Sequence, residues 1–169
     1  MQRGPLQLTP AELKKYDGSD PNLPLYLAIN GTIYDVSNGR RFYGPGGSYQ
    51  YFSGVDATRA FVTGCFAEDL TPDMRGVELM YLPEDNPEID SQYSSGALKK
   101  LKEQERRYAK QQVEMSVKHW VDFFANSPKY IKVGTVKRDE ITGPPPELCK
   151  KAQEGRPKRK EPLEEQRAK

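Results

Sequence analysis

Residues 25–64 read LYLAINGTIYDVSNGRRFYGPGGSYQYFSGVDATRAFVTG, and they hold the clearest structural pattern in the chain. Two apolar runs flank Asn30-Gly31, the dipeptide preferred in two-residue turns between antiparallel strands. Pairing Ile29 with Thr32 directs apolar side chains to both faces of the two strands. We therefore predict a largely buried β-hairpin over residues 25–36.

The next segment, residues 39–54, combines several glycines and a proline with five aromatic residues. Glycine and proline at this density exclude a long helix or strand, and the aromatic rings indicate that the loop packs against something. A loop tyrosine can also bind ferric haem as its phenolate, and neighbouring glycines would let the backbone approach a flat macrocycle. Taken alone, these residues favour packing as the role of the rings, with haem ligation as the alternative.

Three short helices are expected around this region. The first begins at Thr9, where Thr9 and Glu12 form a capping box, and ends near Tyr16. A second, capped by Asp56, is expected over 56–63. A third should start at Thr71-Pro72-Asp73 and run to about residue 82.

The following segment, residues 83–95, is predicted to be an acidic linker, followed by a long helix over 96–125. The first half of this helix is mostly charged, whereas the second half carries an apolar stripe that should dock on the core. The stripe consists of Val113, Val117, Trp120, Val121 and Phe124. A final strand is expected over 130–136 because of its β-branched content.

Composition predicts one compact core with polar appendages, because 36% of the 169 residues are hydrophobic and 30% are charged. We expect residues 1–7 and the polar tail 138–169 to be disordered, including the solvated basic stretch RPKRK at 156–160. The net charge of +2 argues against a nucleic-acid partner. The sequence contains neither an apolar run of about 18 residues nor the apolar region of a signal peptide.

Enzyme motifs are scarce, and we predict a protein that is not an enzyme. Gly44–Gly47 lacks the pattern and context of a phosphate loop. His119 is the only histidine, so one chain cannot supply two histidine ligands, and we expect this side chain to be structural or exposed. Cys65 and Cys149 are far apart in sequence, and we predict two reduced thiols in a reducing compartment.

Residues 25–64 closely resemble the core of the membrane-associated progesterone receptor family, the tyrosine-ligated branch of the cytochrome b5-like haem/steroid-binding domains. The family signature Y-x-A-x-x-G-x-x-[FY]-D-V … G-R-x-F-Y-G-P-x-G-x-Y … F-[AS]-G-x-D-A-[ST]-R is almost intact. The likeness extends more loosely from Leu8 to about Val136, and TGCFAEDLTPDMRGVE is similar to neuferricin-like and fungal members. The resemblance implies an α+β, cytochrome b5-like fold over 8–137, with a small mixed sheet and helices forming a haem pocket. The linker and charged helix at about 83–112 would be an insertion.

The resemblance also implies a site. In the family, the second tyrosine of Y-G-P-x-G-x-Y is the axial iron ligand, which falls on Tyr49. The first tyrosine is a hydrogen-bonding partner beside the haem and falls on Tyr43, and a lysine-tyrosine pair that contacts the haem falls on Lys129 and Tyr130. The implied cofactor is non-covalent haem b. YGPGG stands where true cytochromes b5 carry HPGG, so haem held between two histidines is not expected.

The implied function is that of a haem-binding accessory protein that supports cytochrome P450 and sterol metabolism at the cytosolic face of the endoplasmic reticulum. The alternatives are an electron carrier, a steroid-binding or small-molecule-binding module, and an adaptor without haem. Family likeness also suggests a haem-stacked homodimer. Family members usually carry an N-terminal transmembrane anchor, and this sequence contains none.

Overall fold

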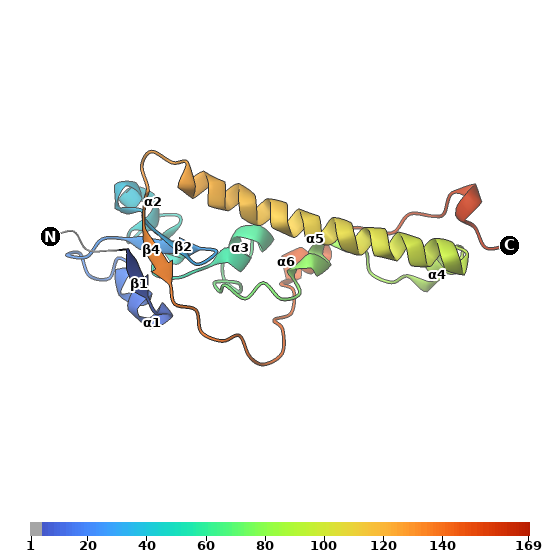
Figure 1. Ribbon diagram of the computed structural model, residues 1–169, viewed down its shortest axis with the longest axis horizontal. Coiled ribbons are helices and arrows are strands. Elements are labelled where there is room, and N and C mark those ends of the chain that lie inside the picture. Colours follow the sequence, from blue (N-terminus) through green and yellow to red (C-terminus); the bar gives the residue numbers. More distant parts are fainter. Residues whose placement is uncertain (1–4) are drawn as a thin grey trace.

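A computed structural model describes residues 5–169 and contains a four-stranded mixed sheet beside a set of helices (Figure 1). The strands are β1 (Leu6–Leu8), β2 (Tyr26–Ile29), β3 (Thr32–Asp35) and β4 (Ile131–Val136), in the spatial order β1-β4-β3-β2. Strand β1 runs parallel to β4, whereas β2–β3 and β3–β4 are antiparallel. The predicted α+β class with a small mixed sheet is confirmed.

The predicted hairpin is confirmed in its register and its burial. Ile29 pairs with Thr32, and the turn residues Asn30 and Gly31 have φ angles of 48° and 80°, as a two-residue hairpin turn requires. Asp56 holds the turn in place, because its Oδ2 accepts a hydrogen bond of 2.9 Å from the Gly31 N–H. One face of the hairpin enters the main core, and the other packs beside α1 and β1; these core residues are Leu25, Leu27, Ile29, Tyr34 and Val36, and Tyr26, Ala28 and Ile33.

Short helices surround the sheet. Helix α1 (Pro10–Leu13) starts at the predicted capping box of Thr9 and Glu12 and continues as a 3-10 turn to Tyr16. Helix α2 (Arg40–Tyr43) lies in the glycine-rich loop, and α3 (Thr58–Thr63) follows Asp56, whose Oδ1 accepts from the Thr58 N–H at 3.1 Å.

The helix predicted over 71–82 is wrong for its first half. Only Val77–Tyr81 is helical, as a 3-10 turn that follows Gly76 at a φ of 82°. The buried Arg59 guanidinium donates to the carbonyl oxygens of Asp73 and Arg75, at 3.0 and 2.9 Å. Those carbonyls therefore bind a side chain from α3 and not helix N–H groups.

The long helix is continuous from Ser95 to Ala125 (α5), about 46 Å in length at 1.5 Å per residue. Of the predicted apolar stripe, Trp120, Val121 and Phe124 pack on the core, whereas Val113 and Val117 do not belong to that cluster. Its N-terminal half extends well beyond the sheet, accompanied by α4 (Pro87–Asp90) (Figure 1). The segment predicted as a linker is therefore partly structured, and its Tyr93 is buried.

The predicted disorder of residues 1–7 is wrong where the structure describes it. Residues 1–4 lie outside the described residues, but Leu6 and Gln7 form β1 and pair with Gly134 and Thr135. This edge strand depends on a partner more than 120 residues later. Local sequence could not indicate it.

The predicted disorder of the tail 138–169 is also wrong. The tail contains α6 (Lys150–Glu154) and runs back along the exposed half of α5. Arg159, expected to be solvated, is buried, and its guanidinium contacts Glu105 at 2.7 Å and Asp90 at 2.5 Å. The Tyr93 hydroxyl donates to the Lys160 carbonyl at 2.6 Å. Charge pairing and hydrogen bonds, which composition does not reveal, hold this segment.

The prediction of two reduced thiols is wrong as well. Cys65, just after α3, and Cys149, just before α6, form a disulfide that spans 84 residues of sequence. Both cysteines are buried with Ala152, and Met80 and Leu148 pack against them. The disulfide fastens the tail to the C-terminal end of α3. The two cysteines are far apart in sequence, and the return of the tail to α3 brings them together.

Candidate functional site

Five rings from the glycine-rich loop and the start of β4 form an aromatic face at one end of the sheet. We define this face as Phe42, Tyr43, Tyr49, Phe52 and Tyr130. The backbone closes the loop beneath it, because the Tyr49 N–H donates to the Phe42 carbonyl at 2.8 Å. Glycine and proline prevent regular structure here, so the rings are presented from a tight turn between α2 and the 3-10 turn Gln50–Phe52.

Three of the predicted site residues lie together in this face. The ring centroids of Tyr43 and Tyr49 are 6.0 Å apart, and those of Tyr43 and Tyr130 are 5.8 Å apart in an edge-to-face arrangement. Tyr43 is buried, with 7% of its surface exposed, whereas Tyr49 is 45% exposed. The two loop tyrosines therefore differ in access: Tyr49 can meet a ligand from solvent, and Tyr43 supports it from behind.

Burial also sets the ionisation of the supporting phenols. It raises the pKa of Tyr43 strongly, and the neighbouring Tyr130, Tyr49 and Tyr51 raise it further. Burial likewise raises the pKa of Tyr130. Both hydroxyls are therefore neutral donors at physiological pH.

Glycine is required beside these rings for space. A Cβ on Gly39 would lie 2.7 Å from the Tyr130 hydroxyl and 3.2 Å from the Tyr43 ring. Gly46, at a φ of 82°, has no atom within 4 Å of the position of its missing Cβ. The backbone at Gly39 thus packs closely against Tyr130, whereas the backbone at Gly46 faces open space.

Lys129, the fourth predicted site residue, directly precedes Tyr130 in the chain. The side chain is exposed, and the backbone makes the contacts that hold this residue: its carbonyl accepts from Asn38 Nδ2 at 3.1 Å, and its N–H donates to Ser127 Oγ at 3.2 Å. His119 is exposed on α5 beside Trp120, consistent with its predicted role.

The donor atoms of the face suit ferric haem. Its polar atoms are phenolic oxygens, and an anionic oxygen is the ligand type that stabilises iron(III). Partly exposed rings offer a flat apolar surface for a macrocycle, and the open Gly46 leaves room for its approach. The residues present therefore fit a haem held from one side by a tyrosine.

Residue-by-residue reasoning did not assign Phe42 and Phe52 to the site. Phe42 lies 6.2 Å and Phe52 6.4 Å from the Tyr49 ring, centroid to centroid, so they border the exposed phenol on two sides. The signal that could have found them was the high aromatic content of residues 39–54, which we assigned to general packing.

A separate cavity of about 440 Å³ lies at the other end of β4. Val136, at the end of β4, lines one side of it, and Gly54 and Val55, which follow Phe52 of the aromatic face in the chain, line another. Its apolar lining comes from Pro10, Leu13, Val55, Pro72, Val136 and Ile141. Charged residues, including Lys14 and Arg138, stand among them.

Comparison with known proteins shows which proteins this chain is similar to. Residues 9–112 match the family described as "Cytochrome b5-like Heme/Steroid binding domain". Membrane steroid-binding protein 2 of Oryza sativa is 38% identical over 133 residues, which cover 78% of this chain and 37% of that protein. Neuferricin of Danio rerio is 52% identical over 63 residues, covering 37% of this chain and 24% of the relative. The cytochrome P450 regulator dap1 of Schizosaccharomyces pombe is 48% identical over 71 residues, covering 42% of each.

A solved Arabidopsis thaliana structure with a cytochrome b5 like fold superposes with a TM-score of 0.52 at 26% identity, covering 80% of this chain and 94% of that one. The matches to curated relatives span less than half of those proteins. Within residues 5–169, none of the helices is both long and apolar enough to cross a membrane. The family match over more than half of the sequence, together with the aromatic face, shows that this chain belongs to the cytochrome b5-like heme/steroid-binding domains, in the membrane-associated progesterone receptor family.

Proposed function

We propose that this protein is a haem-binding accessory module in which Tyr49 ligates the iron of a non-covalent haem b. The observation that carries the proposal is the contrast between Tyr49, which is 45% exposed, and the buried Tyr43 beside it. When bound, haem would supply a ferric centre with one tyrosinate ligand and an open face.

The residues around Tyr49 would divide the remaining work. Tyr43 stays neutral because burial raises its pKa, so its hydroxyl can donate a hydrogen bond to the phenolate oxygen of Tyr49. Tyr130 lies against Tyr43 and would fix its ring. The exposed Lys129 ammonium would pair with a haem propionate, as a charge-assisted contact.

A haemin titration followed by visible spectroscopy tests this proposal. The wild-type protein should take up one haemin and show high-spin ferric features with a tyrosinate charge-transfer band, which Tyr49→Phe should abolish. Tyr108→Phe is the matched control, because Tyr108 is 55% exposed on α5 and should leave the spectrum unchanged. Equal spectra for wild type and Tyr49→Phe would reject Tyr49 as the ligand.

The partner we propose is a cytochrome P450 of sterol metabolism, at the endomembrane system. The name of the fission-yeast relative as a P450 regulator supports the P450 partner, and the membrane steroid-binding relatives support the endomembrane location.

The Cys65–Cys149 disulfide favours the oxidising lumenal side over the cytosolic face that we expected from sequence. Alkylation of the protein inside intact microsomes, before and after permeabilisation, would report which side holds it.

A second candidate function, steroid binding, is favoured by the cavity at the far end of β4. A volume of about 440 Å³ with a mostly apolar lining is in the range of small-molecule sites. Ile141→Arg would place a charge in this wall, whereas Leu163→Arg, on the exposed tail, is the control. Steroid binding in this cavity predicts a Kd raised at least about tenfold by Ile141→Arg alone; an equal Kd for both variants would exclude the cavity.

A further inference from the structure

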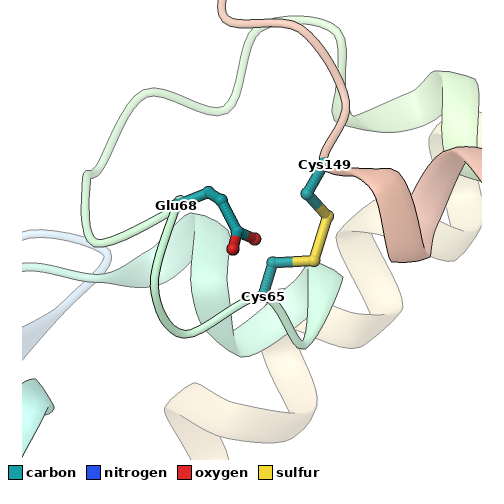
Figure 2. Close-up of side chains that lie close together, drawn as sticks. All are labelled: Cys65, Glu68 and Cys149. Carbon is teal, nitrogen blue, oxygen red and sulfur yellow. A yellow bond between two sulfur atoms is a disulfide. The ribbon is translucent and has the colours of Figure 1, made fainter.

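A second cluster of ligand atoms lies at the disulfide and includes no residue of the aromatic face. The Sγ atoms of Cys65 and Cys149 and a carboxylate oxygen of Glu68 all lie within 4.8 Å of one another (Figure 2). Both cysteines are buried and Glu68 is exposed. The cluster opens onto a surface hollow that Glu68 lines together with Lys150 and Lys151, which gives a solute access to it.

Non-covalent contacts keep Cys149 beside Cys65 independently of the disulfide. On one side of Cys149, the Pro146 carbonyl accepts from Arg59 at 3.4 Å. On the other side, Arg156 Nε donates to the Leu82 carbonyl at 2.9 Å. Because both flanks are fixed, reduction of the disulfide would leave the two sulfur atoms close together.

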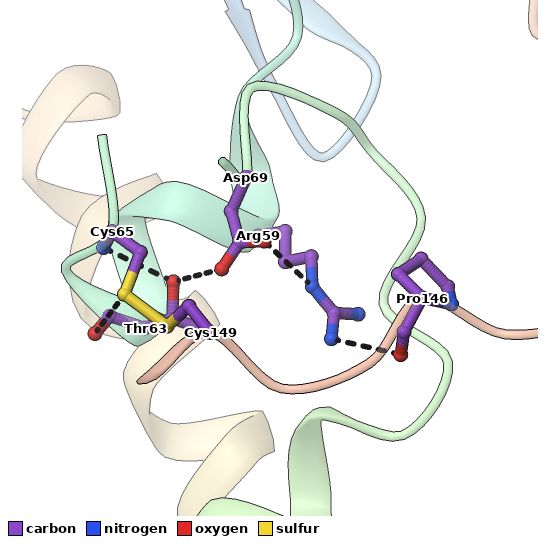
Figure 3. Close-up of a disulfide and its surroundings, with 6 residues drawn as sticks. All are labelled: Arg59, Thr63, Cys65, Asp69, Pro146 and Cys149. Carbon is purple, nitrogen blue, oxygen red and sulfur yellow. Dashed lines mark hydrogen bonds and ion pairs between the residues drawn. A yellow bond between two sulfur atoms is a disulfide. The ribbon is translucent and has the colours of Figure 1, made fainter. Parts of the chain in front are cut away.

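Hydrogen bonds also hold Cys65 and the turn that carries Glu68. Thr63 Oγ1 donates to Asp69 Oδ2 at 2.6 Å and accepts from the Cys65 N–H at 3.2 Å (Figure 3). The Asp69 N–H donates to the Cys65 carbonyl at 3.1 Å, which closes the turn that carries Glu68. Asp69 also meets the buried Arg59, with 3.3 Å between Nε and Oδ1. The turn is therefore anchored to α3 at both ends.

Two thiolates and one carboxylate are a ligand set for Zn²⁺, which favours sulfur and accepts carboxylate oxygen in a tetrahedral arrangement. Calcium and magnesium prefer all-oxygen sites, so the sulfur atoms disfavour them. The Cα atoms of the two cysteines are 6.5 Å apart, a separation that the backbone keeps when the sulfur atoms part.

We propose that reduction converts the Cys65–Cys149 disulfide into a zinc site formed by the two thiolates and the Glu68 carboxylate. A protein dithiol supplies two electrons and two protons and leaves as its own disulfide, and Cys65 and Cys149 become thiols. Zinc binding then displaces both thiol protons to solvent, and water occupies the fourth position. Oxidation of the two thiolates to the disulfide releases the ion; a second disulfide takes up the two electrons, and two protons from solvent, and becomes its dithiol.

The consequence is a tail that stays tied to α3 in both redox states, by a covalent bond in one and by an ion in the other. What changes with redox state is the ion, not the position of the tail. The device would therefore release or capture zinc without rebuilding the fold around the aromatic face.

The test uses the full chain, without haem, in oxidised and phosphine-reduced forms. Reduced wild type should bind one Zn²⁺, and with Co²⁺ in its place should show thiolate-to-cobalt charge-transfer absorption; oxidised wild type should do neither. Glu68→Gln should weaken Zn²⁺ binding at least about tenfold. Loss of a residue that only supports metal ligands already costs about 10- to 100-fold in affinity, and loss of a ligand should cost no less. Glu154→Gln, an acidic residue on the same hollow outside the cluster, is the matched control and should bind as wild type does.

Cys149→Ser should remove the cobalt band, and circular dichroism of this variant checks that the fold survives. The proposal is overturned if reduced wild type binds Zn²⁺ no more tightly than Cys149→Ser. It is also overturned if Glu68→Gln and Glu154→Gln have equal affinities, because Glu68 would then not be a ligand.

Discussion

The ring of Phe52 lies flat against the ring of Phe61, with centroids 4.2 Å apart and planes 7° apart. Phe52 belongs to the aromatic face, whereas Phe61 belongs to α3 and contacts Trp120 and Phe124 of α5. Stacked rings therefore fix the loop that carries Tyr49 to the long helix. A rigid mount of this kind is what a single-ligand haem site needs, because no second protein ligand would hold the cofactor.

Tyr43→Phe should retain haem but bind it about 10- to 150-fold more weakly. The substitution keeps the ring and removes the hydroxyl that would donate to the iron-bound phenolate, and hydrogen bonds to charged groups contribute about 1.5–3 kcal/mol. The tyrosinate charge-transfer band should shift in the same titration. An unchanged band and affinity would show that Tyr43 does not contact the ligand oxygen.

The midpoint potential of the haem-loaded protein should lie below that of a bis-histidine cytochrome b5 measured in the same cell. An anionic oxygen ligand stabilises iron(III), so reduction becomes harder. Tyr49→His should raise the potential, since it replaces the anion by a neutral donor. Spectroelectrochemistry measures both proteins, and a wild-type value near that of cytochrome b5 would support the electron-carrier alternative.

Stability at alkaline pH should depend on Tyr43. Burial, together with its tyrosine neighbours, raises the pKa of this phenol in the folded state, so its contribution is complete below the unfolded pKa of about 10. As the pH rises beyond that value, the unfolded chain loses the proton while folded Tyr43 retains it, and stability falls. Urea unfolding at pH values from about 9 to 11 should show a smaller decline for Tyr43→Phe than for wild type.

Gly39→Ala should lower the free energy of unfolding by about 1–3 kcal/mol, the usual cost of overpacking. The added Cβ would meet the Tyr130 hydroxyl at 2.7 Å and force Tyr130 away from Tyr43. Gly96→Ala is the control: it lies in α5 with nothing within 4 Å of its missing Cβ, so it should stabilise slightly. Similar unfolding curves for the two variants would contradict the close fit at Gly39.

Arg159→Ala should destabilise the protein by about 3 kcal/mol and release the tail. Removing one partner of a buried ion pair leaves the others uncompensated, here Glu105 and Asp90, whose side chains are only 13% and 12% exposed. Limited proteolysis should then cut the chain within residues 157–169. Arg167→Ala, which changes an exposed arginine of the same tail, should leave the tail protected. A protected tail in Arg159→Ala would mean that other contacts suffice.

The accuracy of the sequence predictions depended on the distance between interacting residues. The hairpin around Asn30-Gly31 and the capping box at Thr9 and Glu12 were predicted correctly, because turn and cap chemistry act within a few residues. The long helix was predicted to within one residue of its start, since its periodicity is strong. The helix over 71–82 failed because Arg59, more than ten residues earlier, uses its carbonyl oxygens.

The prediction of a disordered tail was wrong because its partners are also distant in sequence. Nothing local distinguishes Arg159 from the other basic residues around it, and its acidic partners belong to α4 and α5. At the candidate site, motif likeness identified Tyr43, Tyr49 and Tyr130, which the structure places together. It also named Lys129, whose side chain is exposed. The haem contact of Lys129 and the iron-ligand role of Tyr49 stay predictions.

The end of the chain lies at the tip of the projecting half of α5, where Tyr93 forms an isolated β-bridge with Arg167, and the aromatic face lies at the opposite end of the molecule (Figure 1). A fluorophore or affinity tag fused after Lys169 would therefore sit most of a 46 Å helix away from Tyr49. Immobilising the protein through that end would leave the face that we assign to haem turned toward the solution. The fold thus offers its own handle for surface-based measurements of haemin and of partner proteins.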